Sequence, residues 1–214
     1  MKKIILTGAT GFIGFNLLKK LLDNNLEILM ISRNNLEFNN KNLIKIKEDL
    51  RNIDNFIDKI ISFEPEVIVH LAWDGIPDFS FEKSLLNLST SIKFLSKVRN
   101  FCNIKKIVVA GSCYELGENP VGSFGERDIG TPYNYFTWAK HSLRNWLEID
   151  ARKYSYDYAW MRLFYVFGPG QRKDSLIPYL FNAFIKGEIP LIKSINNKND
   201  FIFIDDVISA FHNS

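Results

Sequence analysis

The stretch Thr7-Gly8-Ala9-Thr10-Gly11-Phe12-Ile13-Gly14 decides the fold, because it follows an apolar run and opens a segment of helical period. Gly8 allows a tight turn, Gly11 lets the backbone approach a pyrophosphate, and Gly14 lets helix and strand pack closely. The first amides of the helix add partial positive charge. The turn therefore predicts that a nicotinamide cofactor contacts Gly8, Thr10, Gly11, Phe12, Ile13 and Gly14.

Short apolar runs alternate with longer segments of helical period along the chain. This alternation is typical of βαβ units whose strands form one parallel sheet. Strands are expected at Lys3–Thr7, Glu27–Ser32, Leu43–Lys47, Val67–Ala72, Lys106–Ala110 and Asp157–Arg162. Crossover helices are expected at Phe12–Asn24, Ile53–Phe63, Phe81–Phe101 and Tyr135–Tyr154. We predict an α/β fold with a doubly wound parallel sheet, a Rossmann domain.

The pattern changes after Gly168-Pro169-Gly170. A helix is expected from Ser175 to Lys186, followed by the short segment Ile189–Ile192 and the strand-like run Phe201–Ile204. We therefore divide the chain into a dinucleotide-binding domain at residues 1–167 and part of a smaller lobe at residues 168–214.

Composition and charge exclude several classes of protein. The 214 residues are 46% hydrophobic, enough for one good core. The net charge of +3 is spread along the chain without a basic run, so nucleic acid is not expected as a partner. The N-terminal apolar run is too short for a signal peptide or a membrane span, and Cys102 and Cys113 form no metal-ligand cluster. We expect a cytoplasmic protein with no membrane contact and no metal.

The end of the second predicted strand bears on which nicotinamide cofactor binds. An acidic residue there binds the ribose 2′-hydroxyl of NAD, whereas a basic residue tolerates the 2′-phosphate of NADP. Here Ser32 and Arg33 stand at this place and no carboxylate does, so NADP(H) is favoured, with NAD(H) as the alternative. The alternative treats Arg33 as an ordinary solvated surface charge.

The order of motifs along the chain resembles the extended short-chain dehydrogenases/reductases, specifically their NAD(P)-dependent epimerase/dehydratase group, which acts on nucleotide-linked sugars. The matching motifs are Thr7–Gly14, Asp49-Leu50, His70-Leu71-Ala72, Asn87, Gly111–Gly117, the helix with Lys140, Arg162–Gly170 and Asp200–Asp206. The resemblance implies further cofactor contacts from Asp49, Leu50, Leu71, Ala72, Trp73, Asn87, Lys140 and Phe164. It also implies a nucleotide-sugar substrate.

The chemistry of that family uses a serine or threonine, a tyrosine and a lysine. The lysine lowers the pKa of the phenol, which exchanges a proton with the sugar oxygen that the serine orients. Ser112 matches the serine and Lys140 the lysine. The tyrosine precedes the lysine by four residues, one helical turn, and Phe136 stands there.

A phenyl ring cannot carry the proton, so Phe136 leaves three interpretations open. It is an engineered replacement of tyrosine, a natural departure with altered or lost chemistry, or the sign of another proton donor such as Tyr114 or Tyr165. Relatives also continue beyond the last motif, which predicts an incomplete C-terminal substrate lobe here.

Reduction of a 4-keto deoxysugar nucleotide is the favoured reaction, because reductive biosynthesis uses NADPH and Arg33 favours NADP. Activity is expected to be impaired by Phe136. The alternatives are a nucleotide-sugar 4-epimerase with resident NAD and a non-catalytic NAD(P)-binding regulatory protein. The resemblance also implies a homodimer that pairs the helices 81–101 and 135–154. Phe94, Phe101, Trp138 and Trp146 are compatible with such an interface, and core packing explains them equally well.

Overall fold

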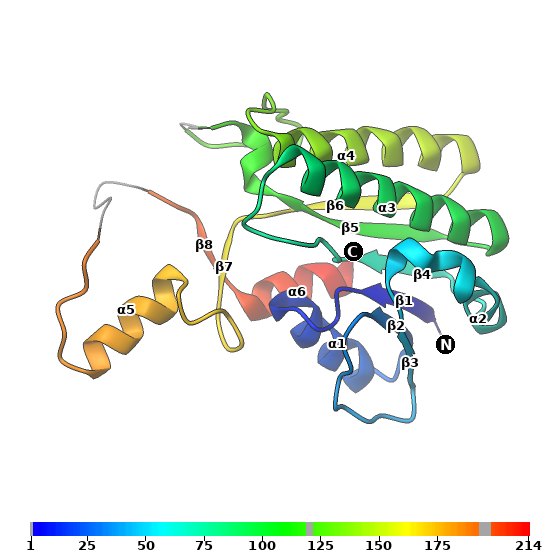
Figure 1. Cartoon of the computed structure of the whole chain (residues 1–214), viewed down its shortest axis with the longest axis horizontal. Helices are drawn as coiled ribbons and strands as arrows, with labels where there is room; N and C mark the ends of the chain where they lie inside the picture. The colour runs from blue at the N-terminus through cyan, green and yellow to red at the C-terminus, as the bar shows by residue number, and fades with distance from the viewer. Residues whose placement is uncertain (1, 119–121, 193–197) are drawn as a thin grey trace.

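The computed structural model describes residues 2–118, 122–192 and 198–214 and has a parallel sheet with helices on both faces (Figure 1). The strands of the sheet are β1 (Lys3–Thr7), β2 (Glu27–Ser32), β3 (Leu43–Lys47), β4 (Val67–His70), β5 (Lys106–Ser112) and β6 (Asp157–Leu163). They lie in the order β3-β2-β1-β4-β5-β6, and each neighbouring pair is parallel. The predicted doubly wound α/β fold is confirmed. The strand order reverses between β1 and β4, where open sheets of this kind bind ligands.

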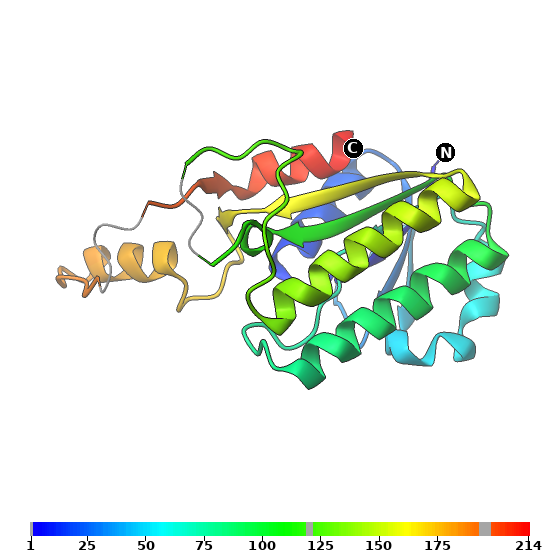
Figure 2. The same cartoon turned by 90° about the horizontal axis from the view of Figure 1, so that it is seen from above.

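Two helical layers cover the sheet (Figure 2). On one face lie α3 (Phe81–Phe101) and α4 (Tyr135–Tyr154), and on the other lie α1 (Phe12–Asp23) and α6 (Ile204–Asn213). Neighbouring residues of β1 serve different cores: Ile5 packs in the cluster of α3 and α4, and Leu6 packs in that of α1 and α6. Both side chains are fully buried. A strand with helices on both faces of its sheet buries every side chain, which explains why its consecutive residues are apolar.

The structure agrees with most of the predicted boundaries to within a single residue and departs further, or in kind, at the following three elements. The helix expected at 53–63 is two pieces, the 3₁₀ helix η1 (Leu50–Asn55) and α2 (Ile57–Phe63), because Phe56 between them has a non-helical φ of −137°. Strand β4 ends at His70 and not at Ala72, whose amide donates to the Thr7 hydroxyl at 3.3 Å. Strand β5 extends to Ser112, because its register with β6 continues to the pair Ser112↔Leu163.

The C-terminal part forms a small extension from the carboxyl edge of the sheet (Figure 1). Strands β7 (Tyr165–Phe167) and β8 (Phe201–Phe203) pair in parallel, and α5 (Leu176–Ile185) lies between them in the chain. The segment Ile189–Ile192 has no regular structure. The division at residue 168 stays a prediction.

Helix α6 is the one long element of the described residues that the sequence analysis did not predict. It follows β8 directly and returns to the sheet, where it packs beside α1. Its apolar residues join the core of β1 and β2; they are Ile204, Val207, Ile208 and Phe211. In the part of the chain that the structure describes, none of the helices combines the length and the apolar character needed to cross a membrane.

Candidate functional site

The turn between β1 and α1 leaves two of its glycines no room for a side chain. At Gly8, where φ is +75°, an added Cβ would lie 2.8 Å from the backbone nitrogen of Ala72. At Gly14 it would lie 2.1 Å from the carbonyl oxygen of Gly8, because α1 packs directly on the turn. Gly11 is less confined, with that same oxygen 3.3 Å from an added Cβ. The turn therefore has the close backbone approach that a dinucleotide pyrophosphate requires.

The N-terminus of α1 presents its amides to this turn. Gly11 is the N-cap residue, and within the described residues no side chain caps the helix. Phe12, Ile13 and Gly14 form the first helical turn. The first amides of an α-helix lack partners inside the helix, so they suit an anionic ligand.

A cavity of about 250 Å³ opens beside the turn, at the carboxyl edge of the sheet. From the turn and the end of β2, it is lined by the predicted residues Gly8, Thr10, Gly11, Ser32 and Arg33. From the ends of β3 and β4 and from α3, it is lined by the predicted residues Asp49, Leu50, Leu71, Ala72, Trp73 and Asn87. The cavity thus gathers most of the expected cofactor contacts, and its donors and glycines fit a dinucleotide.

The remaining predicted residues lie elsewhere. Phe164 lines a different cavity, beside β6 and α6, and the structure does not bring it to the first one. Trp73 lines the cavity, whereas Ser112, Phe136 and Lys140 are not among its lining residues. The Trp73 ring centroid is 3.8 Å from the Lys140 Nζ and 5.6 Å from the Phe136 ring centroid, so Trp73 connects these two residues to the cavity lining.

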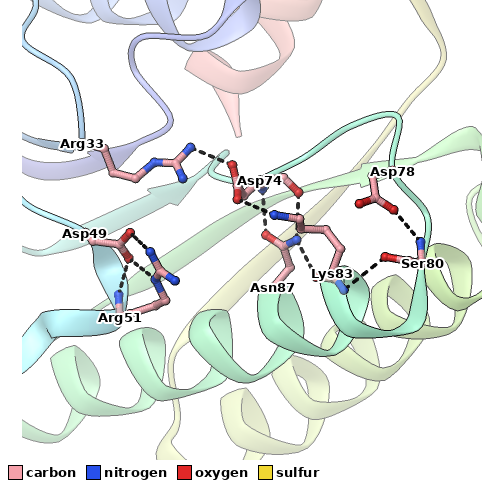
Figure 3. A network of polar contacts seen from close by, with 8 residues as sticks. All are labelled: Arg33, Asp49, Arg51, Asp74, Asp78, Ser80, Lys83 and Asn87. Carbon is pink, nitrogen blue, oxygen red and sulfur yellow. Dashed lines mark hydrogen bonds and ion pairs between the residues drawn. The ribbon is translucent and has the colours of Figure 1, made fainter.

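Arg33 and Asp74, which both line the cavity, form an ion pair that Lys83 joins (Figure 3). Arg33 donates to Asp74 Oδ1 at 2.7 Å, and Lys83 donates to Asp74 Oδ2 at 3.1 Å. These two cations hold the pKa of the Asp74 carboxyl below its usual value. Sequence analysis missed Asp74, although a polar residue just after a parallel strand lies at the ligand-binding edge of the sheet and is a usable signal.

Asp49 and Arg51, which also line the cavity, form a second ion pair (Figure 3). The Asp49 carboxylate accepts two bonds from the Arg51 guanidinium, at 2.9 and 2.7 Å, and one from the Arg51 amide at 2.9 Å. Arg51 holds the pKa of Asp49 below its usual value. Arg51 was not predicted, because nothing in its spacing distinguishes it from a surface charge.

His70 is a buried residue that lines the cavity. Its Nδ1 lies 2.9 Å from the Thr7 hydroxyl, and its Nε2 lies 3.0 Å from the Ser91 hydroxyl. Burial, assisted by the charge of Lys140, lowers the pKa of His70 to about 3. The imidazole is therefore neutral at physiological pH and ties β4 to β1 and α3.

This buried imidazole is expected to make the fold sensitive to acid. The unfolded state takes up a proton near pH 6.5, whereas the folded state does so only near pH 3, so stability falls as the pH is lowered between these values, by at most about 1.4 kcal/mol per pH unit. Denaturant unfolding of wild type and His70→Gln, at neutral and mildly acidic pH, measures this. The loss on acidification should be smaller in His70→Gln, and equal losses would contradict the assignment.

Lys140 lies against β5 near its carboxyl end, and β5 ends at Ser112. The Lys140 Nζ is buried and donates to the carbonyl oxygen of Ala110 at 2.9 Å. Burial lowers the pKa of Lys140 to about 7, against a smaller opposing effect of Glu115. The Lys140 side chain is therefore about half protonated at neutral pH, and a group in that state readily takes up or gives up a proton.

Glu115 fixes the position of Ser112 and was missed by the sequence analysis. The buried carboxylate accepts from the Ser112 amide at 2.7 Å and from the Trp160 indole nitrogen at 2.9 Å. Gly111 leaves space for this arrangement, because an added Cβ there would lie 2.3 Å from the Trp160 indole nitrogen. The Ser112 hydroxyl accepts from the Tyr114 amide at 3.2 Å.

Phe136 is buried in an aromatic cluster, with its ring centroid 4.8 Å from that of Phe79 and 6.4 Å from that of Tyr114. Tyr114, one of the two other proton donors considered from the sequence, therefore belongs to this cluster. Burial raises the pKa of Tyr165, so its phenol stays protonated at neutral pH. Burial also raises the pKa of the Cys113 thiol to about 11, which keeps this thiol neutral.

Comparisons with known proteins extend over almost the whole chain. The family model described as the NAD dependent epimerase/dehydratase family matches residues 4–213. A putative UDP-glucose 4-epimerase of Methanocaldococcus jannaschii is 29% identical, and the match covers 97% of this chain and 71% of that protein. The dTDP-4-dehydro-6-deoxyglucose reductase of Escherichia coli is 25% identical, with coverage of 97% and 71%.

A solved structure supports the same fold. The UDP-glucuronic acid 4-epimerase of Bacillus cereus, in complex with UDP-glucuronic acid and NAD, superposes with a TM-score of 0.83 and 23% identity. The superposition covers 98% of this chain and 72% of that one. At this identity the likeness establishes the fold.

Proposed function

Because the chain belongs to the NAD dependent epimerase/dehydratase family, we propose that it is an NAD(P)-dependent oxidoreductase of nucleotide-sugar metabolism that reduces a 4-keto sugar nucleotide. The observation that carries the proposal is the position of Lys140, which bonds to Ala110 in β5, the strand that ends at Ser112, and contacts Trp73 in the lining of the cavity that fits a dinucleotide. NADPH, when bound, supplies the hydride.

Different residues of the cavity would hold the pyrophosphate and the 2′-phosphate of the cofactor. The glycine turn and the start of α1 suit the pyrophosphate. Ser32 and Arg33 suit a 2′-phosphate, because no carboxylate follows β2 directly and Arg33 lines the cavity. We therefore favour NADP(H), although the family is NAD-dependent by description.

The catalytic residues would act on the sugar carbonyl. The Ser112 hydroxyl would orient the oxygen, the protonated form of Lys140 would provide positive charge beside it, and the proton that the reduced oxygen takes up would come from water. Phe136 contributes neither a proton nor a hydrogen bond, so turnover is impaired in this chain. Reduction is tested by incubating the protein with NADPH and a nucleotide 4-ketosugar and following the loss of NADPH; no hydride transfer, even by Phe136→Tyr, would overturn the proposal.

Two other functions each have an observation in their favour. A nucleotide-sugar 4-epimerase with resident NAD is favoured by the relatives that bear this name, and release of tightly bound NAD on denaturation would identify it. A non-catalytic NAD(P)-binding regulatory protein is favoured by Phe136 and by the indole that covers Lys140. Cofactor binding without turnover in Phe136→Tyr would identify that function.

Replacing Arg33 with alanine is expected to weaken NADPH binding by about 10-fold or more while NADH binding changes little. The reason is that charge-assisted hydrogen bonds to a phosphate contribute about 1.5–3 kcal/mol, and NADH offers no 2′-phosphate to lose them. Calorimetric titration with both cofactors measures the two dissociation constants. Equal losses for NADH and NADPH would contradict the preference for NADP(H).

A homodimer formed through α3 and α4 completes the proposal. Phe81, Leu85 and Trp138 expose apolar surface on these helices, and the Phe81 ring lies on both Tyr135 and Trp138. Phe94 is fully buried in the core and contributes nothing to such an interface. The mass in solution tests the pairing.

Free cysteines Cys102 and Cys113 support the proposed cytoplasmic location, since thiols stay reduced there.

A further inference from the structure

We propose that Asp74 is a specificity-determining residue, because it competes with the 2′-phosphate of the cofactor for Arg33. This inference rests on the proposed NADP(H) preference and adds a second residue that sets its size. Asp74 comes from the loop after β4, whereas Arg33 comes from the end of β2, so their bond joins two walls of one cavity (Figure 3).

Asp74 is the fixed member of the pair. Its amide donates to Asn87 Oδ1 at 2.7 Å, and its carbonyl oxygen accepts from Asn87 Nδ2 at 2.9 Å (Figure 3). Its second carboxylate oxygen accepts from Lys83 at 3.1 Å. Asn87 and Lys83 both belong to α3. The Asp74 carboxylate therefore keeps its place and one cation even when Arg33 leaves.

Arg33 is the less constrained member of the pair. Its side chain is 55% exposed, and the 2.7 Å bond to Asp74 is the one hydrogen bond that its guanidinium makes within the described residues. Little holds the rest of this long side chain, so it is free to turn toward a ligand in the cavity. The position of Arg33 directly after β2 is the one from which a basic side chain reaches the 2′-phosphate of an adenosine ribose.

A carboxylate and a phosphate cannot share this guanidinium without cost. Both are anions, and the cations beside Asp74 keep it ionised at neutral pH by lowering the pKa of its carboxyl. When the guanidinium turns to the phosphate, its bond to Asp74 is lost. Losing that bond costs free energy and therefore weakens the binding of NADPH. NADH has no 2′-phosphate, so its binding leaves the bond between Arg33 and Asp74 in place.

Asp74→Asn is therefore expected to strengthen NADPH binding relative to NADH. The ratio of the NADH to the NADPH dissociation constant should rise about 2- to 5-fold, the size expected from a partly exposed ion pair. Asp78→Asn is the matched control: it makes the same change in the same loop, but Asp78 accepts from the Ser80 amide at 2.9 Å and does not contact Arg33 (Figure 3). Its ratio should stay at the wild-type value.

The full experiment titrates NADH and NADPH into wild type, Asp74→Asn, Asp78→Asn, Arg33→Ala and the double variant Arg33→Ala/Asp74→Asn. The inference predicts that the effect of Asp74→Asn disappears in the Arg33→Ala background. An unchanged or lower ratio in Asp74→Asn, while Arg33→Ala lowers it, overturns the inference and leaves the NADP(H) preference standing. An unchanged ratio in Arg33→Ala overturns that preference and the inference together. Thermal unfolding of each variant checks that it is folded.

Discussion

Phe136→Tyr is expected to raise the rate of 4-keto reduction by about 100- to 10,000-fold, the contribution typical of general acid–base catalysis. Position 136 is one helical turn before Lys140, and the Lys140 Nζ lies 5.9 Å from the centroid of the Phe136 ring. A phenol oxygen added to this ring would lie near an ammonium group, which lowers the pKa of a phenol. Single-turnover oxidation of NADPH with a nucleotide 4-ketosugar measures the gain.

Two variants give this experiment its controls. Phe79→Tyr adds a phenol to the neighbouring ring of the same aromatic cluster, 4.8 Å from Phe136 between centroids. Because position 79 is outside the helix that carries Lys140, this phenol is not expected to accelerate the reaction. Phe136→Tyr combined with Lys140→Met should lose most of the gain. An equal rate in Phe79→Tyr would show that the position of the phenol is irrelevant and would contradict the assignment.

Gly14→Ala is expected to lower the free energy of unfolding by about 3 kcal/mol, at the upper end of what overpacking usually costs. The added Cβ would lie 2.1 Å from the Gly8 carbonyl oxygen and 2.9 Å from the Ala9 Cα. Both neighbours are backbone atoms of a tight turn, so no side chain can swing aside to make room. The same displacement should widen the turn and weaken binding of both NADH and NADPH.

Denaturant unfolding and cofactor titration measure the two effects of Gly14→Ala. Gly125→Ala provides the comparison, because an added Cβ there meets its nearest neighbour, Asp128 Oδ2, at an ordinary 3.7 Å. The stability of Gly125→Ala should stay within about 1 kcal/mol of wild type, since nothing is overpacked. If Gly14→Ala were equally stable, the close packing of α1 on the turn would not constrain the fold.

The sheet could be predicted from the sequence because its pattern is local and repeated. Each strand is a short apolar run, and each crossover helix shows its own period, so errors were confined to boundaries such as Phe56. Helix α6 escaped prediction because it begins at Ile204 immediately after β8, with no loop to separate a strand from a helix. Its burial depends on α1, which is distant in sequence.

Some residues of the candidate site could also be predicted from the sequence, whereas others could not. The glycine turn could be predicted because the spacing of its glycines is typical of turns that leave little room for a side chain. The positions of Ser112 and Lys140 followed from the motifs. Asp74 and Glu115 were not predicted, because their importance arises from partners brought close only by folding: Arg33 for the first and Trp160 for the second. Their roles as catalytic or cofactor-binding residues remain proposals.

The packing of α6 on α1 also has a consequence for synthesis on the ribosome. The apolar face of α1, including Leu17 and Leu18, shares its core with Val207 and Phe211 of α6. Translation proceeds at about 5–20 residues per second, so the α1 face waits without α6 for many seconds after it emerges. During that interval it offers an apolar surface to chaperones or to other nascent chains. Completion of this half of the core therefore waits until α6 has been synthesised, long after α1.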